Sequence, residues 1–337
     1  MKCAVFHGPA DLRVEHRPRP EIRHDGDVLL RVEAASICGT DLHILADPPG
    51  HPATPGAILG HEYIGEILDA GAGVEGLRAG DRVVVDPNIT CGKCPYCRRG
   101  ATNLCLNMTT LGIFRDGGFA EYNVAPAGAL YPISKQTPLE QAIFAEPLSC
   151  VLNGFSQSGL KIGDSVVILG AGPIGLLFLL LFRMGGAGRV GVAEILPNRA
   201  GLATRASAYV VWNPREGDLA AQVKEWSGLG ADIVVDTVGS LFGQALRLVR
   251  RGGRVVLFGM NQQAAPAVSQ YEITRQQISI VGSFIAGGTF PQTVRTLESG
   301  QLPLEQLITH RIGLEGIPRI LPALHSGEAV EVVIRPE

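Results

Sequence analysis

The sequence has little charge, few aromatic residues and almost no charge imbalance. Charged residues make up 18% of its 337 residues, aromatic residues 6%, and the formal net charge is -3. No run of like charge marks a nucleic-acid-binding tail, so we expect no nucleic-acid partner. Hydrophobic residues make up 46%, which favours a large buried core over disorder. A chain of this length exceeds what one core usually supports, so two domains are expected.

The sequence also lacks an export signal and internal repeats. Met1 to Ala10 do not show the basic and then apolar layout of a signal peptide. The uncharged stretch Val166 to Phe182 approaches the length of a membrane span, but it contains three glycines and a proline. A short strand, a turn and a helix explain this stretch better, so we expect no membrane partner.

Four of the seven cysteines crowd into one short segment. Without an export signal, such a cluster indicates metal binding before disulfides and favours the reducing cytoplasm. Cys91, Cys94, Cys97 and Cys105 have the spacing C-x2-C-x2-C-x7-C, which lets four thiolates close a tetrahedron around Zn²⁺. Because no position stays open for substrate, this zinc would be structural. Free buried thiols and an iron–sulfur cluster are the alternatives.

From about Gly163 onward, short apolar runs alternate with helical patterns. Continuous apolar strands are expected where both faces of a parallel sheet are covered. The alternation indicates a doubly wound parallel sheet, so the predicted fold class is α/β. The predicted strands are Ser165–Leu169, Arg189–Ala193, Ala208–Val211, Asp232–Val235, Arg254–Phe258 and Ser279–Val281, and the helices between most of them are Ile174–Met184, Asn198–Ser207, Leu219–Trp226 and Phe242–Val249.

The segments before and after this alternation are different. Residues 1 to about 150 are rich in glycine, proline and short β-branched runs, which indicates a β-rich domain. After Phe284 the chain becomes loop-rich again, with a helix expected at Phe290–Ser299 and a last strand at Val330–Ile334. This tail is too short for a third domain and is expected to pack on the first. The predicted domains are residues 1–152 with 286–337, and residues 153–285.

A glycine-rich turn follows the first strand of the alternating segment. Gly170, Gly172 and Gly175 have the G-x-G-x-x-G spacing, directly after a predicted strand and at the start of a predicted helix. The glycines allow a tight turn, close approach to a pyrophosphate and close packing of helix and strand, while the helix N-terminus offers free N–H groups. We therefore predict a dinucleotide site that includes Pro173 and Ile174. A glycine-rich turn without a nucleotide is the alternative.

An acidic residue decides between the two nicotinamide dinucleotides. Glu194 closes the second strand, nineteen residues after Gly175. A carboxylate there accepts hydrogen bonds from the ribose hydroxyls of NAD and repels the 2′-phosphate of NADP. Arg199 is the first arginine after it, five residues on. NAD is therefore favoured over NADP.

A second set of residues with metal-binding side chains lies within the β-rich segment of residues 1 to about 150. Cys38, His61, Glu62 and Glu146 supply the sulfur, nitrogen and oxygen ligands that catalytic zinc uses. Separately, each is ordinary, since a lone buried cysteine usually belongs to a core and a lone histidine is usually a satisfied polar residue. Together they indicate a second zinc site.

At this point the chain resembles the zinc-containing medium-chain dehydrogenases over essentially its whole length. The resemblance implies a GroES-like catalytic domain interrupted by a Rossmann domain. Within this family, the chain is similar to polyol, sorbitol and threonine dehydrogenases. The matching motifs are Cys38-Gly39-Thr40-Asp41, Gly60-His61-Glu62, Gly80-Asp81-Arg82-Val83, the four-cysteine loop, Gly117-Gly118-Phe119-Ala120-Glu121-Tyr122 and Gly170 to Gly175.

The resemblance assigns roles around the second zinc. Cys38 and His61 resemble the two constant ligands. Glu62 resembles a carboxylate that ligates zinc directly in polyol-type members and lies behind the ligands in others. Glu146 matches the position of a fourth ligand or of a carboxylate bridged through water. Zinc would supply Lewis acidity, and the nicotinamide would accept the hydride.

Further roles carry over to residues near the substrate and the cofactor. Thr40 and His43 match a proton relay from the alcohol to solvent, whereas Asp41 is interpreted as a structural residue that bonds neighbouring backbone. Ser283 and Phe284, after the last Rossmann strand, are predicted nicotinamide neighbours. The complete set of candidate cofactor-binding residues is Gly170, Gly172, Pro173, Ile174, Gly175, Glu194, Arg199, Val238, Ser283 and Phe284.

The substrate is predicted to be a polyol or another secondary alcohol, oxidised reversibly to the ketone. The segment Glu146-Pro147-Leu148-Ser149 is similar to polyol and polyol-phosphate dehydrogenases, and the start at Cys38 is similar to threonine dehydrogenases. Ile285 stands where sorbitol dehydrogenases carry an arginine, and Glu331 stands where the family often has a lysine near the cofactor. Leu45, Phe114, Phe119 and Ile285 could line the substrate pocket or belong to ordinary packing.

Two other interpretations compete with an alcohol dehydrogenase. A non-catalytic nucleotide-binding protein would not need Cys38, Thr40, His43, His61 and Glu62 together. A zinc-free reductase of the same fold would lack both zinc motifs, and this chain has both. By analogy with the family, a homodimer or homotetramer is expected.

Overall fold

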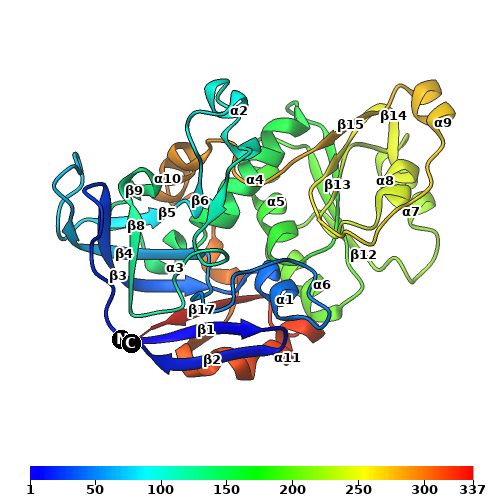
Figure 1. Cartoon of the computed structure of the whole chain (residues 1–337). Helices are drawn as coiled ribbons and strands as arrows, with labels where there is room; N and C mark the ends of the chain where they lie inside the picture. The colour runs from blue at the N-terminus through cyan, green and yellow to red at the C-terminus, as the bar shows by residue number, and fades with distance from the viewer. Residues whose placement is uncertain (337) are drawn as a thin grey trace. The chain divides into compact units, whose positions relative to one another are not determined.

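The computed structural model describes residues 1–336, which form two compact units (Figure 1). Unit 1 comprises Met1–Ser149 together with the chain from Ala286 onward, and unit 2 comprises Cys150–Ile285. The division falls inside helix α4 (Ala145–Ser158). The assignment of residues 1–152 with 286–337 as a catalytic domain, and of residues 153–285 as an NAD-binding domain, stays a prediction.

Unit 2 contains one six-stranded sheet in which every neighbouring pair of strands is parallel. The strand order is β12-β11-β10-β13-β14-β15. The chain therefore begins in the middle of the sheet and changes direction between β12 and β13, which is the doubly wound arrangement of dinucleotide-binding folds. This confirms the predicted fold class. The strands are β10 (Ser165–Leu169), β11 (Arg189–Ala193), β12 (Val210–Trp212), β13 (Ala231–Asp236), β14 (Val249–Leu257) and β15 (Ser279–Gly282).

The helices of unit 2 lie close to their predicted positions. Helix α6 starts at Pro197, which fits the first turn because proline lacks only an N–H that would be unpaired there. The uncharged stretch is divided between β10 and α5, and α5 is only 12 residues long, against about 20 for a membrane span. No helix within residues 1–336 is long and apolar enough to cross a membrane. The helices are α5 (Pro173–Met184), α6 (Pro197–Arg205), α7 (Leu219–Ser227), α8 (Phe242–Leu248) and α9 (Gln270–Gln276).

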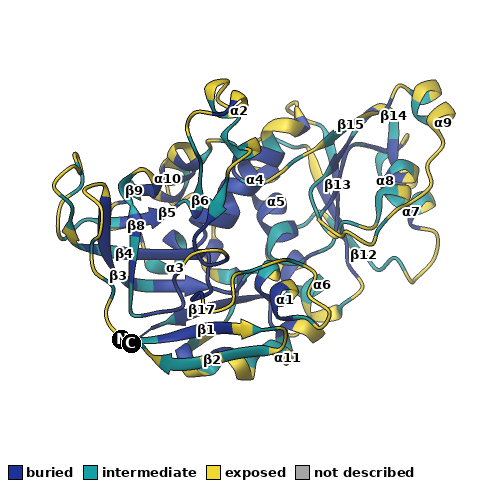
Figure 2. Ribbon diagram, viewed as in Figure 1, coloured by how far each residue is buried: buried dark blue, intermediate teal, exposed yellow. Residues whose placement is uncertain are grey.

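Unit 1 is β-rich and is built around one long strand, β3. This strand pairs antiparallel with β4, β8 and β17, so the last strand of the chain lies beside an early one. The sheet order is β16-β17-β3-β4-β5-β9, with β8 on β3. Figure 2 shows β3 largely as buried. The strands are β1 (Lys2–Gly8), β2 (Asp11–His16), β3 (Asp27–Ser36), β4 (Glu62–Ala70), β5 (Arg82–Val85), β6 (Asn88–Ile89), β7 (Thr109–Thr110), β8 (Tyr122–Pro126), β9 (Leu130–Pro132), β16 (Ile308–Gly313) and β17 (Glu331–Arg335).

Short helices connect the strands of unit 1. The helix expected at Phe290–Ser299 is confirmed as α10 (Phe290–Glu298), and its Phe290 and Leu297 are buried. The others are α1 (Gly39–Leu45), α2 (Pro95–Arg98), α3 (Leu139–Ala142) and α11 (Ile317–Ser326), with 3-10 turns η1 (Thr102–Leu104), η2 (Ala127–Ala129), η3 (Leu304–Leu307) and η4 (Leu314–Gly316).

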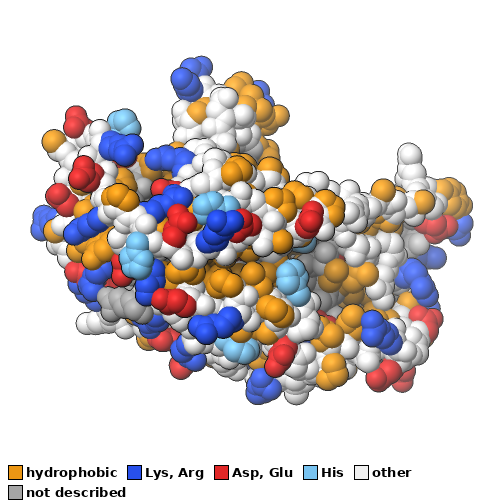
Figure 3. Space-filling view, turned by 60° about the horizontal axis from the view of Figure 1, so that its bottom comes forward, with side chains coloured by type: hydrophobic (Ala, Val, Ile, Leu, Met, Phe, Trp, Pro, Cys, Tyr) orange, Lys and Arg blue, Asp and Glu red, His pale blue; other side chains and the backbone are white. Residues whose placement is uncertain are grey.

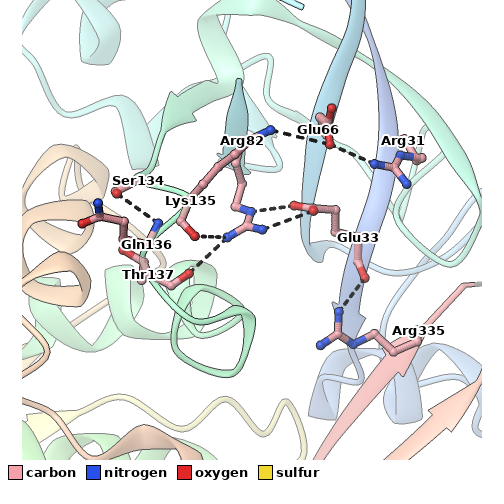
Figure 4. Close-up of polar contacts among 9 residues, drawn as sticks. All are labelled: Arg31, Glu33, Glu66, Arg82, Ser134, Lys135, Gln136, Thr137 and Arg335. Atoms are coloured by element: carbon pink, nitrogen blue, oxygen red, sulfur yellow. Dashed lines mark hydrogen bonds and ion pairs between the residues drawn. The ribbon is translucent and has the colours of Figure 1, made fainter. Parts of the chain in front are cut away.

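Ion pairs tie the strands of unit 1 together at one place (Figure 4). Arg82 of β5 donates from Nε to Glu33 of β3 at 2.7 Å and from its second terminal nitrogen at 3.3 Å. Arg31 of β3 pairs with Glu66 of β4 at 2.8 Å. The Arg82–Glu33 pair is bidentate and mostly buried, which is the geometry in which such pairs add stability. Elsewhere, acidic and basic side chains are interspersed on the face drawn in Figure 3.

Candidate metal centres and cofactor site

Three different metal-binding side chains meet at the end of β3 and the start of β4. Cys38 follows β3 and precedes α1, while His61 and Glu62 lie at the start of β4, which pairs with β3. One ligand atom from each of Cys38, His61 and Glu62 lies within 4.8 Å of the others. His61 and Glu62 are buried, and Cys38 is half-buried. The strand pairing thus brings together residues that are more than twenty positions apart in the sequence.

A glycine shapes the approach to this cluster. Gly60 has a φ of 90°, which is costly for any residue with a Cβ atom. A Cβ atom there would also lie 2.3 Å from Cδ1 of Phe119. Phe119 and Leu45 are buried in the core cluster of unit 1, which fits ordinary packing; their part in a substrate pocket stays a prediction. Phe114 is 39% exposed.

The buried charges of the cluster act on one another. Burial raises the pKa of the Cys38 thiol to about 11, with a further contribution from Glu62. Burial alone would lower the pKa of His61, but Cys38 and Asp41 raise it well above its ordinary value. Burial raises the pKa of Glu62, and burial together with the nearby Glu62 raises the pKa of Glu331. A divalent cation would offset this concentration of acidic groups.

Asp41 has a larger part in the site than the sequence indicated. Its Oδ2 accepts a hydrogen bond from the Cys38 N–H at 2.9 Å, which is the predicted backbone contact. Its Oδ1 lies 3.6 Å from Nδ1 of His61, and neither atom has another partner. Carboxylates that face the second nitrogen of a metal-binding histidine fix its ring and raise its basicity. The signal in the sequence was the position of Asp41 three residues after Cys38.

The remaining predicted catalytic residues have different positions. Thr40 places its hydroxyl oxygen 3.6 Å from the Cys38 sulfur, whereas His43 is exposed on α1. Glu146 is buried in the first turn of α4, but the mutually close ligand atoms of the cluster do not include it. The proton relay and the part of Glu146 stay predictions.

The three close donors fit a zinc ion. Sulfur, imidazole nitrogen and carboxylate oxygen are all zinc ligands, and a catalytic zinc site uses three protein ligands and keeps one position for water or substrate. The unpaired Nδ1 of His61 beside Asp41 leaves Nε2 as the nitrogen that a metal could bind. The donor set and its burial therefore suit a catalytic metal.

The four-cysteine loop brings its sulfur atoms together at a second place in unit 1. One sulfur from each of its four members lies within 4.8 Å of the others. In a zinc tetrahedron with bonds near 2.3 Å, sulfurs lie about 3.8 Å apart. An iron–sulfur cluster would spread the sulfurs farther, because several metal atoms stand between them. The geometry favours a single ion held by Cys91, Cys94, Cys97 and Cys105.

Backbone N–H groups surround these sulfurs. Cys91 donates to the sulfur of Cys105 at 3.3 Å, Cys94 to that of Cys91 at 3.4 Å, and Cys97 to that of Cys94 at 3.5 Å. Asn107 donates its backbone N–H to Cys105 at 3.4 Å. The N–H groups of Lys93 and Cys94 lower the pKa of Cys91 to about 6. The loop backbone therefore favours the thiolate at Cys91, whereas burial raises the pKa of Cys97 to about 11.

The glycine-rich turn of unit 2 has the geometry that its spacing predicted. Gly170 has a φ of 98°, and Pro173 begins α5. A Cβ atom on Gly175 would lie 2.0 Å from the carbonyl oxygen of Gly170, so only glycine lets the helix pack this closely on the strand. Gly172 precedes the helix and Ile174 lies in its first turn, with the free N–H groups of that turn available to a phosphate.

The Glu194 carboxylate already has three hydrogen bonds. It is buried and accepts from the N–H groups of Ala171 at 2.7 Å, Ile195 at 2.7 Å and Leu196 at 2.8 Å. The bond from Ala171 joins the end of β11 to the glycine-rich turn. Arg199 lies near Gly172, and its Nε has no partner.

The last candidate cofactor residues lie on loops of unit 2. Val238 follows Asp236, a buried residue absent from the predicted set, whose carboxylate accepts the N–H groups of Val238 and Gly239 at 2.9 Å each. Ser283 has a hydroxyl oxygen without a partner, and Phe284 is 41% exposed. Asp236 ends a buried strand, which was the available signal for its role in holding this loop.

Comparison with known proteins places the chain in a family. The model of the alcohol dehydrogenase GroES-like domain matches residues 24–135, and that of the zinc-binding dehydrogenase matches residues 173–299. D-arabinitol dehydrogenase 1 of Uromyces fabae is 34% identical, with 100% of this chain and 97% of the relative covered. L-threonine 3-dehydrogenase of Pyrococcus horikoshii is 36% identical, with 99% and 97% covered.

A solved structure agrees with these sequence matches. A candidate zinc-binding dehydrogenase from Sinorhizobium meliloti 1021, bound to NADP, has a TM-score of 0.93 and 33% identity, and the match covers 99% of each chain. The fold, the two matched domain models and relatives similar over nearly the whole length all agree. The chain belongs to the family of zinc-binding alcohol dehydrogenases with a GroES-like domain.

Proposed function

We propose that the protein transfers a hydride between a polyol or another secondary alcohol and NAD, and so produces the ketone. The observation that carries this proposal is the buried cluster of Cys38, His61 and Glu62, whose sulfur, nitrogen and oxygen donors suit a zinc ion with one open position. The glycine-rich turn of unit 2 adds the elements of a dinucleotide site.

Cys38, His61 and Glu62 would hold the catalytic zinc. When bound, zinc would supply Lewis acidity that lowers the pKa of an alcohol, and the nicotinamide would accept the hydride. Asp41 would hold the His61 ring through Nδ1. Thr40 and His43 would pass the alcohol proton to solvent, and Glu146 would act through water.

The four cysteines of the loop would hold a second, structural zinc. Four thiolates leave no position for a substrate, so this ion would act on stability and not directly on the reaction. The resulting content is two zinc ions per chain. The four-cysteine loop, whose sulfur atoms would hold a metal ion and not form disulfides, supports a reducing compartment, for which we propose the cytoplasm.

NAD is the proposed cofactor because of the charge of Glu194. A buried carboxylate at the end of the second strand would repel a 2′-phosphate, and its oxygens keep lone pairs for ribose hydroxyls. Arg199, with its unpaired Nε near Gly172, supports the competing choice of NADP. A comparison of kcat/KM for the two cofactors decides between them.

A polyol is the proposed substrate class because D-arabinitol dehydrogenase 1 is similar over the whole chain. The similarity to an L-threonine 3-dehydrogenase keeps threonine as the second candidate. Polyol phosphates stay a further candidate, because the segment Glu146-Pro147-Leu148-Ser149 is similar to polyol and polyol-phosphate dehydrogenases. A homodimer or homotetramer is proposed by analogy with the family.

The direct test is an NAD⁺ reduction screen over secondary alcohols, pentitols, hexitols, their phosphates and threonine. Zinc per chain is measured by mass spectrometry on the same dialysed sample. We expect about two zinc ions per chain, because the protein has two sets of metal ligands. We expect the highest kcat/KM with a free polyol, because D-arabinitol dehydrogenase 1 is similar over the whole chain.

The matched variant is Cys38→Ser. It is expected to remain folded, to keep the loop zinc, to lose the other zinc and to have no measurable dehydrogenase activity. A folded Cys38→Ser protein with full activity would refute the proposed function. Threonine as the best substrate would leave the zinc chemistry in place and correct only the substrate.

A further inference from the structure

Three strands of unit 1 bring a serine and two glutamates together behind the zinc cluster. Ser36 at the end of β3 stands directly opposite Glu62 on β4 and opposite Val333 on β17. Because side chains alternate along a strand, Glu331, two residues before Val333, points to the same side of the sheet as Val333. The register therefore places Ser36 between Glu62 and Glu331.

The contacts agree with this register. The Ser36 hydroxyl donates to Oε2 of Glu62 at 2.5 Å. Ser36 is fully buried, Glu62 is 4% exposed and Glu331 is 2% exposed. Oε1 of Glu331 has no hydrogen-bond partner. A buried carboxyl oxygen without a partner is costly, so its presence calls for an explanation.

Throughout residues 1–336, no ion pair joins Glu62 or Glu331 to a lysine or an arginine. A lysine behind Glu62 would attract its carboxylate in a buried setting where such attraction is strong. Glu331, which stands there instead of a lysine, does not attract the Glu62 carboxylate. The Glu62 carboxylate accepts the Ser36 hydroxyl, and one of its oxygens lies within 4.8 Å of ligand atoms of Cys38 and His61.

We propose that Ser36 is a positioning residue that directs Glu62 toward the catalytic metal for direct binding, and that Glu331 leaves this arrangement undisturbed by a buried cation. Ser36 fixes one carboxylate oxygen by hydrogen bonding. Glu331 keeps the space behind Ser36 free of a cation that would draw Glu62 away. This inference rests on the proposed zinc site at Cys38 and His61.

The test is the pair Glu331→Lys and Glu331→Gln, with zinc affinity measured by chelator competition. In Glu331→Lys, the new ammonium group pairs with Glu62, so we expect zinc affinity at this site to fall about 10- to 100-fold, as for other changes behind metal ligands. Glu331→Gln keeps the shape of the side chain and adds no cation. The zinc affinity of this variant should therefore stay within about threefold of that of the starting protein, in line with the loss of at most one weak hydrogen bond.

A spectroscopic measurement separates positioning from general damage. Cobalt(II) replaces zinc at the cluster, and its visible absorption reports the number and type of ligands. Glu331→Lys is expected to change this spectrum, whereas Glu331→Gln and the control Glu305→Lys keep it. Glu305 lies in the same unit, and its side chain is 77% exposed. Glu305→Lys therefore makes the same change of charge as Glu331→Lys, but at an exposed position.

Each result has a definite meaning. A folded Glu331→Lys protein with unchanged zinc affinity and cobalt spectrum would overturn the inference. If that variant does not fold, Ser36→Ala decides, because it removes the hydrogen bond to Glu62 and must shift the cobalt spectrum. A starting protein with zinc only in its cysteine loop would contradict the proposed function itself, whereas two zinc ions and an insensitive Glu331 would contradict only this inference.

Discussion

The two candidate zinc sites of unit 1 are built in opposite ways. The loop site takes four identical ligands from fifteen consecutive residues, Cys91 to Cys105, and its sulfurs accept hydrogen bonds from the backbone of the same loop. The other site takes three different ligands from the ends of two paired strands, and its buried carboxyl neighbours Asp41 and Glu331 come from α1 and β17. The first depends on local sequence, and the second depends on the sheet.

The loop site is therefore suited to stabilising the fold, and the other site is suited to binding a substrate. A closed shell of thiolates leaves no position for a substrate, while a site with three ligands keeps one position open. The open site therefore needs a rigid surrounding to hold its ligands, and the sheet of unit 1 provides it. The loop, about half of whose residues are exposed, would depend on its metal for order.

Removing one loop ligand is expected to have the largest effect. In Cys97→Ser, the loop should lose its zinc and become sensitive to protease between residues 91 and 107, because structural zinc contributes about 10–16 kcal/mol to folding in small zinc peptides. The melting temperature should fall, while the zinc at the buried site remains. Zinc analysis, limited proteolysis and calorimetry measure these effects. An intact loop with two zinc ions in Cys97→Ser would show that the comparison is wrong.

Two glycines offer a matched test of how rigid each site is. In Gly60→Ala, a φ of 90° and the 2.3 Å approach to Phe119 should together cost about 2–5 kcal/mol of the free energy of unfolding. In Gly92→Ala, in the loop, the φ is 68° and nothing lies near the new atom, so the cost should be about 1–2 kcal/mol.

Urea denaturation of both variants measures the difference. Gly60→Ala should also lose activity, because Gly60 precedes His61 directly. Equal costs for the two substitutions would mean that the buried site relaxes as readily as the loop.

A smaller effect is expected behind the buried ligands. Asp41→Asn removes the charge that faces His61 Nδ1 at 3.6 Å, so zinc affinity at the buried site should fall about 10- to 100-fold. The loop zinc should be unaffected. Chelator competition on the two sites measures this, and Glu75→Gln, an exposed change from carboxylate to amide in the same unit, serves as the control. Equal zinc loss from both sites would point to general destabilisation instead.

The same contrast explains how far the sequence could lead. The cysteine spacing and the glycine-rich turn are local patterns, so the close sulfurs and the positive φ of Gly170 followed from spacing. The α/β sheet followed from apolar runs. The contacts of Asp41 with His61 and of Ser36 with Glu62 depend on which strands pair and in which register. One sequence carries no direct record of that pairing.

Two further residues show where local reasoning ended. Glu146 was matched by resemblance to a fourth ligand or to a carboxylate bridged through water; the close donor set comprises Cys38, His61 and Glu62, and the part of Glu146 stays a prediction. Glu331 was noticed only as a departure from a common lysine. Its burial beside Ser36 and Glu62 became visible once β17 was paired with β3.

The smallest expected effect is at the outer contacts of the loop. Asn107 donates its side-chain amide to the Cys91 sulfur at 3.7 Å and is exposed. Asn107→Ala should lower zinc affinity by only about two- to threefold, since an exposed hydrogen bond contributes about 0.5 kcal/mol and the backbone donors remain. Chelator competition measures the zinc affinity of Asn107→Ala, and the loss in Asp41→Asn is the reference for a large effect. A tenfold loss in Asn107→Ala would mean that the loop, like the buried site, depends on side chains behind its ligands, and the distinction between a locally built and a sheet-built site would no longer hold.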